Sequence, residues 1–118
     1  MSATTQHAQP ARELRGDGLS MLPTIWPGDL LGIRPVETAD LKPGAVLVYP
    51  GPAKQMIAHR LIGSLGQGDE RQLLLRGDAH ASHERVPVSA IAFVVTRVTG
   101  RLGSFTMDSP RGRMYRSL

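Results

Sequence analysis

Short apolar runs separated by glycine and proline set the pattern of hydrophobic and polar positions along this chain. Five of these runs either alternate or are rich in β-branched residues, as strands are: 29–34, 45–49, 55–63, 72–76 and 91–98. The third run carries Ile57, His59 and Leu61 on one face, because strand side chains alternate with a period of two. Closely spaced short strands with Gly/Pro turns predict a mainly β fold, a small barrel-like domain.

The ends of the chain differ in composition from its middle. We expect residues 1–15 to be a flexible N-terminus, residues 16–100 to form the domain, and residues 101–118 to be a basic C-terminal tail. Ser109 followed by Pro110 is typical of a helix start, so the sequence predicts a short helix over residues 109–118.

Composition narrows the classes of function. The chain has 118 residues, a net charge of +4 and no cysteine. The length fits one domain, and the missing cysteines exclude disulfides, thiolate nucleophiles and cysteine-ligated metal sites. Residues 1–96 carry as many acidic as basic side chains, so the whole excess lies in residues 97–118, where five arginines stand with Asp108 alone. The few aromatic residues are scattered and form no base-stacking platform, so we expect no nucleic-acid partner.

The sequence has no segment typical of export or of membrane insertion. Residues 1–15 lack the apolar core of a secretory signal, and the longest apolar run, residues 90–95, is far shorter than the roughly 20 residues of a spanning helix. We therefore expect a soluble, cytoplasmic protein. Alternatively, the arginine-rich end docks on a membrane surface or a membrane partner, which would make the protein peripheral. The sequence leaves the oligomeric state open.

The segment with the strongest chemical signal is Gly18-Leu19-Ser20-Met21-Leu22-Pro23-Thr24-Ile25-Trp26-Pro27-Gly28-Asp29. It predicts a turn, or one short helical segment over residues 20–28, that is stiffened by two prolines and leads into a strand. A serine in such a turn is usually an ordinary turn residue. It becomes a nucleophile only where a base lies within hydrogen-bond reach and N–H groups surround the developing oxyanion.

Two further segments carry candidate partners for Ser20. His59 is the one histidine in a predicted strand, although a lone histidine there is usually a packed side chain. Residues 77–85 are predicted to form a polar loop, which contains Asp78 and Glu84. A carboxylate in that loop would orient the histidine and stabilise its imidazolium, as in serine hydrolases. The alternative is a solvated loop without a role in chemistry.

Together these segments resemble the serine peptidase clan that contains the signal peptidases and the self-cleaving repressors. The family's Gly-x-Ser-Met-x-Pro-Thr…Gly-Asp box is matched at Gly18, Ser20, Met21, Pro23, Thr24, Gly28 and Asp29. The resemblance continues through residues 41–49, His59-Arg60-Leu61-Ile62-Gly63 and the Gly77-Asp78 box, and covers about residues 16–100. It implies a signal-peptidase-like β barrel.

The resemblance also implies the roles of the site residues. His59, 39 residues after Ser20, stands where bacterial signal peptidases have lysine, as in the histidine branch of endoplasmic-reticulum, archaeal and small soluble bacterial enzymes. Ser20 is then the nucleophile and His59 the general base, so activity is expected to fall below about pH 6.5. That branch has a second acid seven residues after its Gly-Asp glycine. We favour Asp78 as the third member because its box is intact, with Glu84 as the rival.

The remaining implications concern the oxyanion and the substrate. Gly18 leaves no side-chain donor two residues before the nucleophile, so the backbone N–H groups of Leu19 and Ser20 are the expected oxyanion donors. The resemblance implies a serine endopeptidase that cuts a leader or signal segment from a precursor peptide or protein after a small residue, with no cofactor. Two alternatives stay open: a self-cleaving regulator of the repressor type, and a non-catalytic β module that binds extended peptides.

Two further motifs have residue types that are known from metal sites and from adhesion proteins. His80-x-x-His83 beside the two loop acids has metal-ligating residue types, but a single short loop without a distant ligand does not predict a metal site. Arg-Gly-Asp occurs at residues 15–17 and 76–78, and without an export signal we do not interpret it as an adhesion motif.

Overall fold

The computed structural model describes residues 12–16, 18–101 and 103–113, and these residues form a mainly β domain. Eight strands follow in chain order: β1 (Arg12–Arg15), β2 (Leu30–Pro35), β3 (Val46–Pro50), β4 (Met56–Leu65), β5 (Gln72–Arg76), β6 (Glu84–Pro87), β7 (Phe93–Gly100) and β8 (Gly103–Thr106). Three short 3₁₀ helices lie between strands: Thr38–Asp40, Gly68–Glu70 and Val88–Ala90. No helix in the described ranges has the length and apolar character needed to cross a membrane.

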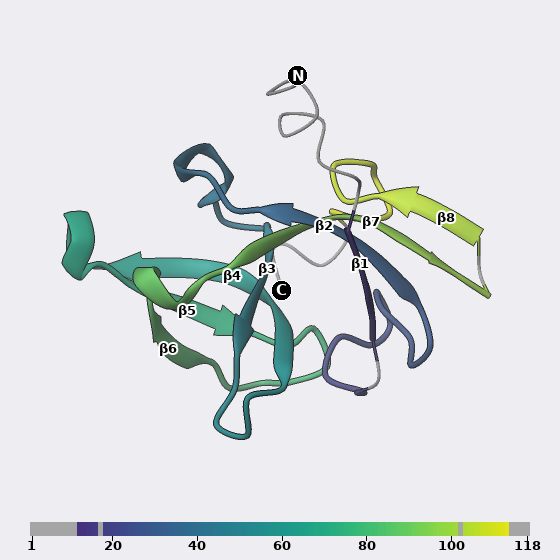
Figure 1. Cartoon of the computed structure of the whole chain (residues 1–118), viewed down its shortest axis with the longest axis horizontal. Helices are drawn as coiled ribbons and strands as arrows, with labels where there is room; N and C mark the ends of the chain where they lie inside the picture. The colour runs from purple at the N-terminus through teal and green to yellow at the C-terminus, as the bar shows by residue number, and fades with distance from the viewer. Residues whose placement is uncertain (1–11, 17, 102, 114–118) are drawn as a thin grey trace, which may run out of the picture.

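All strand pairs are antiparallel, and they form one curled sheet in the order β1-β2-β7-β3-β4-β5-β6, with β8 added to β7. Figure 1 shows β4, β5 and β6 to one side of β3, and β1, β2 and β8 to the other. The register shifts in β2 between Gly32 and Ile33 and in β4 between Leu61 and Gly63. Such irregularities bend a strand and increase its twist, so they help the sheet curl into a half-barrel.

The central strand β3 is buried on both faces and divides the core in two. Val46 and Val48 point into one apolar cluster, and Leu47 and Tyr49 into the other. All four side chains are at most 3% exposed. Burial on both faces explains why this strand reads as a continuous apolar run. Removing this much apolar surface from water is the main stabilising contribution of the fold, at about 25 cal/mol per Å².

The five strands expected from the apolar runs are all present; β5 has the expected bounds, and the ends of the other four are displaced by one or two residues. Three strands were not expected. β1 lies in the segment interpreted as a flexible N-terminus, β6 at the end of the polar loop, and β8 in the basic tail. Residues 109–113 form turns rather than the start of the expected helix, and residues 114–118 lie outside the described residues.

Candidate active site

The turn that carries Ser20 is held by its neighbours in the motif. The N–H groups of Thr24 and Ile25 both donate to the Met21 carbonyl, at 2.8 and 2.9 Å. Met21 and Ile25 are buried in the apolar cluster on one face of β3, and the Asp29 carboxylate accepts the Trp26 N–H at 2.8 Å. These contacts fix the backbone that follows the serine. The partly exposed Ser20 side chain therefore stands on a rigid turn.

Ser20 meets His59 at the surface of the sheet. The Ser20 Oγ lies 3.1 Å from His59 Nε2, within hydrogen-bond distance. His59 sits on β4 opposite Leu47 of β3, and its side chain is 12% exposed. Ile57 and Leu61 contribute to the same apolar cluster as Leu47, which confirms the one-face prediction for β4. The structure thus brings together a hydroxyl and an imidazole that are 39 residues apart in sequence.

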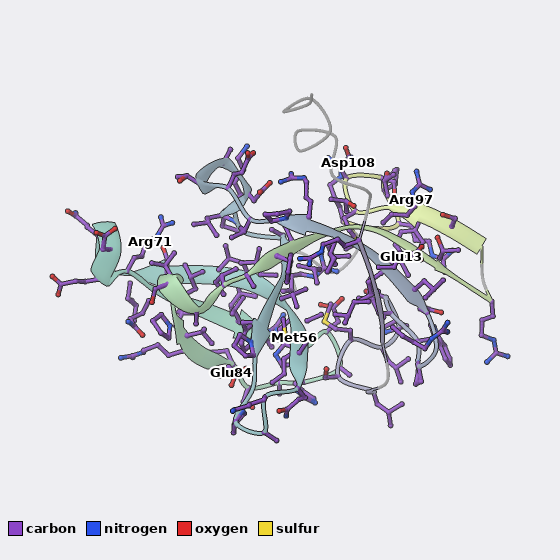
Figure 2. The ribbon with its side chains drawn as sticks, viewed as in Figure 1. Glu13, Met56, Arg71, Glu84, Arg97 and Asp108 are labelled. Atoms are coloured by element: carbon purple, nitrogen blue, oxygen red, sulfur yellow. The ribbon has the colours of Figure 1, made fainter. Side chains whose placement is uncertain are left out.

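The other ring nitrogen of His59 faces Tyr49 and Glu84. Its Nδ1 is 3.2 Å from the Tyr49 hydroxyl and 3.6 Å from Glu84 Oε1, and the Tyr49 hydroxyl donates a hydrogen bond to that same carboxylate oxygen. Tyr49 is 3% exposed, whereas the Glu84 side chain is 49% exposed. Figure 2 labels Glu84 at the start of β6, in the lower half of the view.

Asp78 lies away from the imidazole. Its two oxygens accept hydrogen bonds from Arg60 Nε and Nη2, both at 2.8 Å, and Thr24 Oγ1 donates to Oδ2 at 2.5 Å. Among the described residues no hydrogen bond joins Asp78 to His59. The reason is strand geometry: His59 and Arg60 are consecutive on β4 and so point to opposite faces. Of the two acids in the 77–85 segment, Glu84 faces His59 and Asp78 faces Arg60.

The loop after β5 packs directly on the Ser20 backbone. The Ala79 N–H donates to the Ser20 carbonyl at 2.9 Å, and the Asp78 N–H points to the Met21 sulfur at 3.4 Å. A Cβ on Gly77 would lie 2.4 Å from the Ser20 carbonyl oxygen, so close that the backbone of one of the two segments would have to shift. The glycine of the Gly-Asp box is therefore required by close backbone approach, and its aspartate anchors the loop.

The surroundings of His59 favour the neutral imidazole. Burial lowers the pKa of His59 below its ordinary value of 6.5, and the nearby His80 lowers it further, while the charge of Asp78 opposes both effects. The His80 ring stands edge-on to the His59 ring, with 6.0 Å between centroids. A histidine that is neutral near pH 7 can accept the serine proton, which is the property that a general base needs.

Two hollows flank the Ser20–His59 pair. One has a volume of about 160 Å³, is bordered by Ser20, and has mostly apolar walls from β1, β2, the serine turn and the start of β4, where Figure 2 labels Met56. The other measures about 270 Å³ and is bordered by His59, with apolar walls from Ile57 and Leu75 and polar side chains from His80, Ser82, His83 and Glu84. The pair therefore sits between two recesses, and the one beside His59 carries most of the titratable side chains.

The apolar hollow lies between two strand segments that each have a partner on one side. β1 pairs with β2, and residues 56–59 of β4 pair with β3, while β5 pairs with β4 from Arg60 onward. In the described part of the sheet, the second edge of each segment is unpaired. An unpaired edge offers N–H and C=O groups to an extended peptide.

The other predicted features are less defined. No described backbone carbonyl accepts the N–H of Leu19 or Ser20, and their oxyanion role stays a prediction. Within the described ranges no group of three or more His, Asp or Glu residues is placed to hold a metal ion.

Sequence reasoning missed Tyr49. A hairpin closed by residues 51–55 would have placed Tyr49 opposite Ile57, two residue pairs from His59 on the same face, and that register was the available signal.

A comparison of the chain with protein-family models, curated proteins and solved structures finds no significant match in any of them. The resemblance to signal peptidases accordingly stays a prediction from the motif residues.

Proposed function

We propose that the protein is a serine endopeptidase of the signal-peptidase type, with Ser20 as nucleophile and His59 as general base. The observation that carries the proposal is the 3.1 Å contact between Ser20 Oγ and His59 Nε2. A nucleophile and a base within hydrogen-bond reach, with the base in turn held by a third group, is the arrangement of covalent acyl-transfer catalysis.

The proposed reaction is an acyl transfer through Ser20. Ser20 Oγ attacks the scissile carbonyl carbon as its proton moves to His59 Nε2, and the carbonyl electrons collect on the oxygen. The N–H groups of Leu19 and Ser20 are the proposed donors to that oxyanion, where one donor can contribute about 3 kcal/mol. His59 then gives its proton to the leaving amine as the C–N bond breaks. In the second half of the reaction, water attacks the acyl carbon as it gives a proton to His59, and His59 passes that proton to Ser20 Oγ as the bond between Oγ and the acyl carbon breaks.

Glu84 is the acid that we now propose as the partner of His59, in place of Asp78. Glu84 Oε1 faces His59 Nδ1 at 3.6 Å and is also bound by the Tyr49 hydroxyl. Asp78 has both oxygens occupied by Arg60 and Thr24, so its proposed role is to hold the loop that supports Ser20.

The proposed substrate is an extended segment of a precursor peptide or protein, added along the unpaired strand edges beside the apolar hollow. Met21, Ile25 and Leu31 are among the apolar residues that line this hollow, which suits a small apolar side chain on the acyl side of the scissile bond. Cleavage would release a leader or signal segment.

The test is labelling of the full chain by a fluorophosphonate probe, which reports an activated serine without knowledge of the substrate. We expect labelling at Ser20, abolished in Ser20→Ala and reduced at least 100-fold in His59→Ala. Ser64→Ala is the matched control, because Ser64 is exposed on the same strand as His59. Labelling elsewhere, or none, would contradict the proposal.

The same samples separate the alternatives. A self-cleaving regulator would lose mass from its 12.8 kDa chain on incubation in alkaline buffer, and the Ser20→Ala protein would not. A peptide-binding module would bind extended peptides without being labelled.

A further inference from the structure

Tyr49 lies between His59 and Glu84. Its buried phenol completes a chain of hydrogen bonds in which each group donates to the next. For Ser20 Oγ to donate to His59 Nε2, that nitrogen must be unprotonated, so the neutral ring carries its proton on Nδ1. The Tyr49 oxygen lies 3.2 Å from Nδ1, whereas Glu84 Oε1 lies 3.6 Å away, which is too far for a good hydrogen bond. The Nδ1 proton therefore points to the phenol.

The phenol can accept that proton's hydrogen bond because its own proton is used elsewhere. The Tyr49 hydroxyl donates to Glu84 Oε1. Ser20 donates to His59, His59 to Tyr49, and Tyr49 to Glu84, and each donor is used once. We propose that Tyr49 is a positioning residue for the peptidase reaction, which selects the catalytic tautomer of His59 and transmits the charge of Glu84 to it.

Burial explains why the phenol rather than the carboxylate would set the ring position. Tyr49 is 3% exposed on the central strand β3 and packs among buried aliphatic side chains, including Leu47 and Leu75. Its ring stands edge-on to the His59 ring, with 6.2 Å between centroids. Glu84 has a side chain that is 49% exposed, and an exposed carboxylate alone fixes geometry poorly and is screened by solvent.

The role of Tyr49 rests on the proposed function. It adds no covalent step to the peptidase reaction. When Nε2 takes the Ser20 proton, His59 becomes an imidazolium whose Nδ1–H still donates to Tyr49. The phenol keeps its proton and directs it toward Glu84, so the positive ring faces an oxygen that the carboxylate polarises. Three other charged or titratable groups lie close to this chain: His80 beside the His59 ring, and Asp78 with its partner Arg60 on the opposite face of β4.

The deciding variant is Tyr49→Phe, which keeps the ring and removes only the hydroxyl. We expect fluorophosphonate labelling of Ser20 to slow at least 10-fold, and the pH at which labelling is half-maximal to fall, because the imidazolium loses its acceptor. Val86→Ala is the control, since Val86 belongs to the same apolar cluster as Tyr49 but has no side-chain group that could take part in the chain of hydrogen bonds. It should lower stability and leave the pH profile in place.

A double-mutant cycle with Glu84→Gln tests the connection. If Tyr49 transmits the effect of Glu84, the double variant is about as slow as the slower single variant, whereas independent effects would multiply. Multiplying effects, or a Tyr49→Phe protein with the wild-type rate and pH profile, would overturn the proposal.

A second measurement does not require activity. Nitrogen-15 shifts of the His59 ring report which nitrogen carries the proton and give its pKa. In Tyr49→Phe we expect a smaller population of the Nδ1–H tautomer and a lower imidazole pKa. Should the wild-type protein not react with the probe, the proposed function fails. An unchanged His59 tautomer and pKa in Tyr49→Phe would overturn the role of Tyr49.

Discussion

Arg60 and Asp78 form a buried pair joined by two parallel hydrogen bonds of 2.8 Å, with side chains that are 1% and 2% exposed. The same guanidinium donates to the carbonyls of Gly44 and Gly112, at 2.9 and 3.1 Å. One side chain on β4 therefore ties the loop after β5 to the turn before β3 and to the C-terminal turn. Because that loop supports Ser20, the pair couples the stability of the domain to the geometry of the candidate site.

Asp78→Asn should be strongly destabilising because it leaves Arg60 as an uncompensated buried charge. Removal of one partner of a buried pair costs about 3–5 kcal/mol. We expect a large decrease in the urea midpoint. Asp69→Asn, at an exposed position in the 3₁₀ helix after β4, should leave the midpoint unchanged. The milder Thr24→Val removes one hydrogen bond to the Asp78 carboxylate and should cost about 1.5–3 kcal/mol. Equal midpoints for Asp78→Asn and Asp69→Asn would contradict the anchoring role.

The lowered pKa of His59 predicts how activity and stability depend on pH. Labelling of Ser20 should reach its plateau with an inflection below pH 6.5, because the base must be neutral. The unfolded chain binds this proton at about pH 6.5 and the folded chain only at lower pH. The free energy of unfolding therefore falls as pH drops from about 6.5 through the pKa of folded His59, and the contribution of this group is constant below it.

His80→Gln should raise the pKa of His59, because it removes a neighbouring positive charge that disfavours the imidazolium. The inflection of the labelling profile should then move to higher pH. His83→Gln is the matched control, since His83 borders the same hollow and has no described contact with the His59 ring. An inflection that stays in place in His80→Gln, or moves equally in both variants, would show that His80 does not act on His59 electrostatically.

Gly77→Ala should impair the Ser20 geometry, because the new Cβ would lie 2.4 Å from the Ser20 carbonyl oxygen. Overpacking of this kind costs about 1–3 kcal/mol, and displacement of a nucleophile by about 1 Å can cost 10²-fold in rate. We expect labelling of Ser20 to slow by at least 10-fold while the protein stays folded by circular dichroism. Gly63→Ala is the control, since its Cβ would meet Leu74 at an ordinary 3.6 Å. Equal labelling rates would argue against close packing at Gly77.

The difference between Asp78 and Glu84 shows where sequence reasoning reaches its limit. The resemblance to signal peptidases implied that Ser20, His59 and an acid from the 77–85 segment would come together, whereas strand periodicity alone predicted only the face of β4 that carries His59. Which acid faces His59 depends on the register of β6 against β5, and Glu84 pairs with Leu75. Charged or small residues in β1, β6 and β8 hide these strands, because such residues lack the β-branched and apolar pattern by which strands are predicted.

Phe105→Ala tests whether the C-terminal segment belongs to the domain. Phe105 lies on β8, is 9% exposed, and packs in the same apolar cluster as Met21 and Ile25 of the serine turn. The Arg111 guanidinium stands over its ring at 4.4 Å. Loss of the ring should cost about 3–5 kcal/mol and lower the urea midpoint accordingly. Ser104→Ala, at the exposed neighbouring position, removes only hydrogen bonds at the surface and should cost less than about 1 kcal/mol. An unchanged urea midpoint in Phe105→Ala would contradict this prediction and would support the separate basic tail that the charge of residues 101–118 indicates.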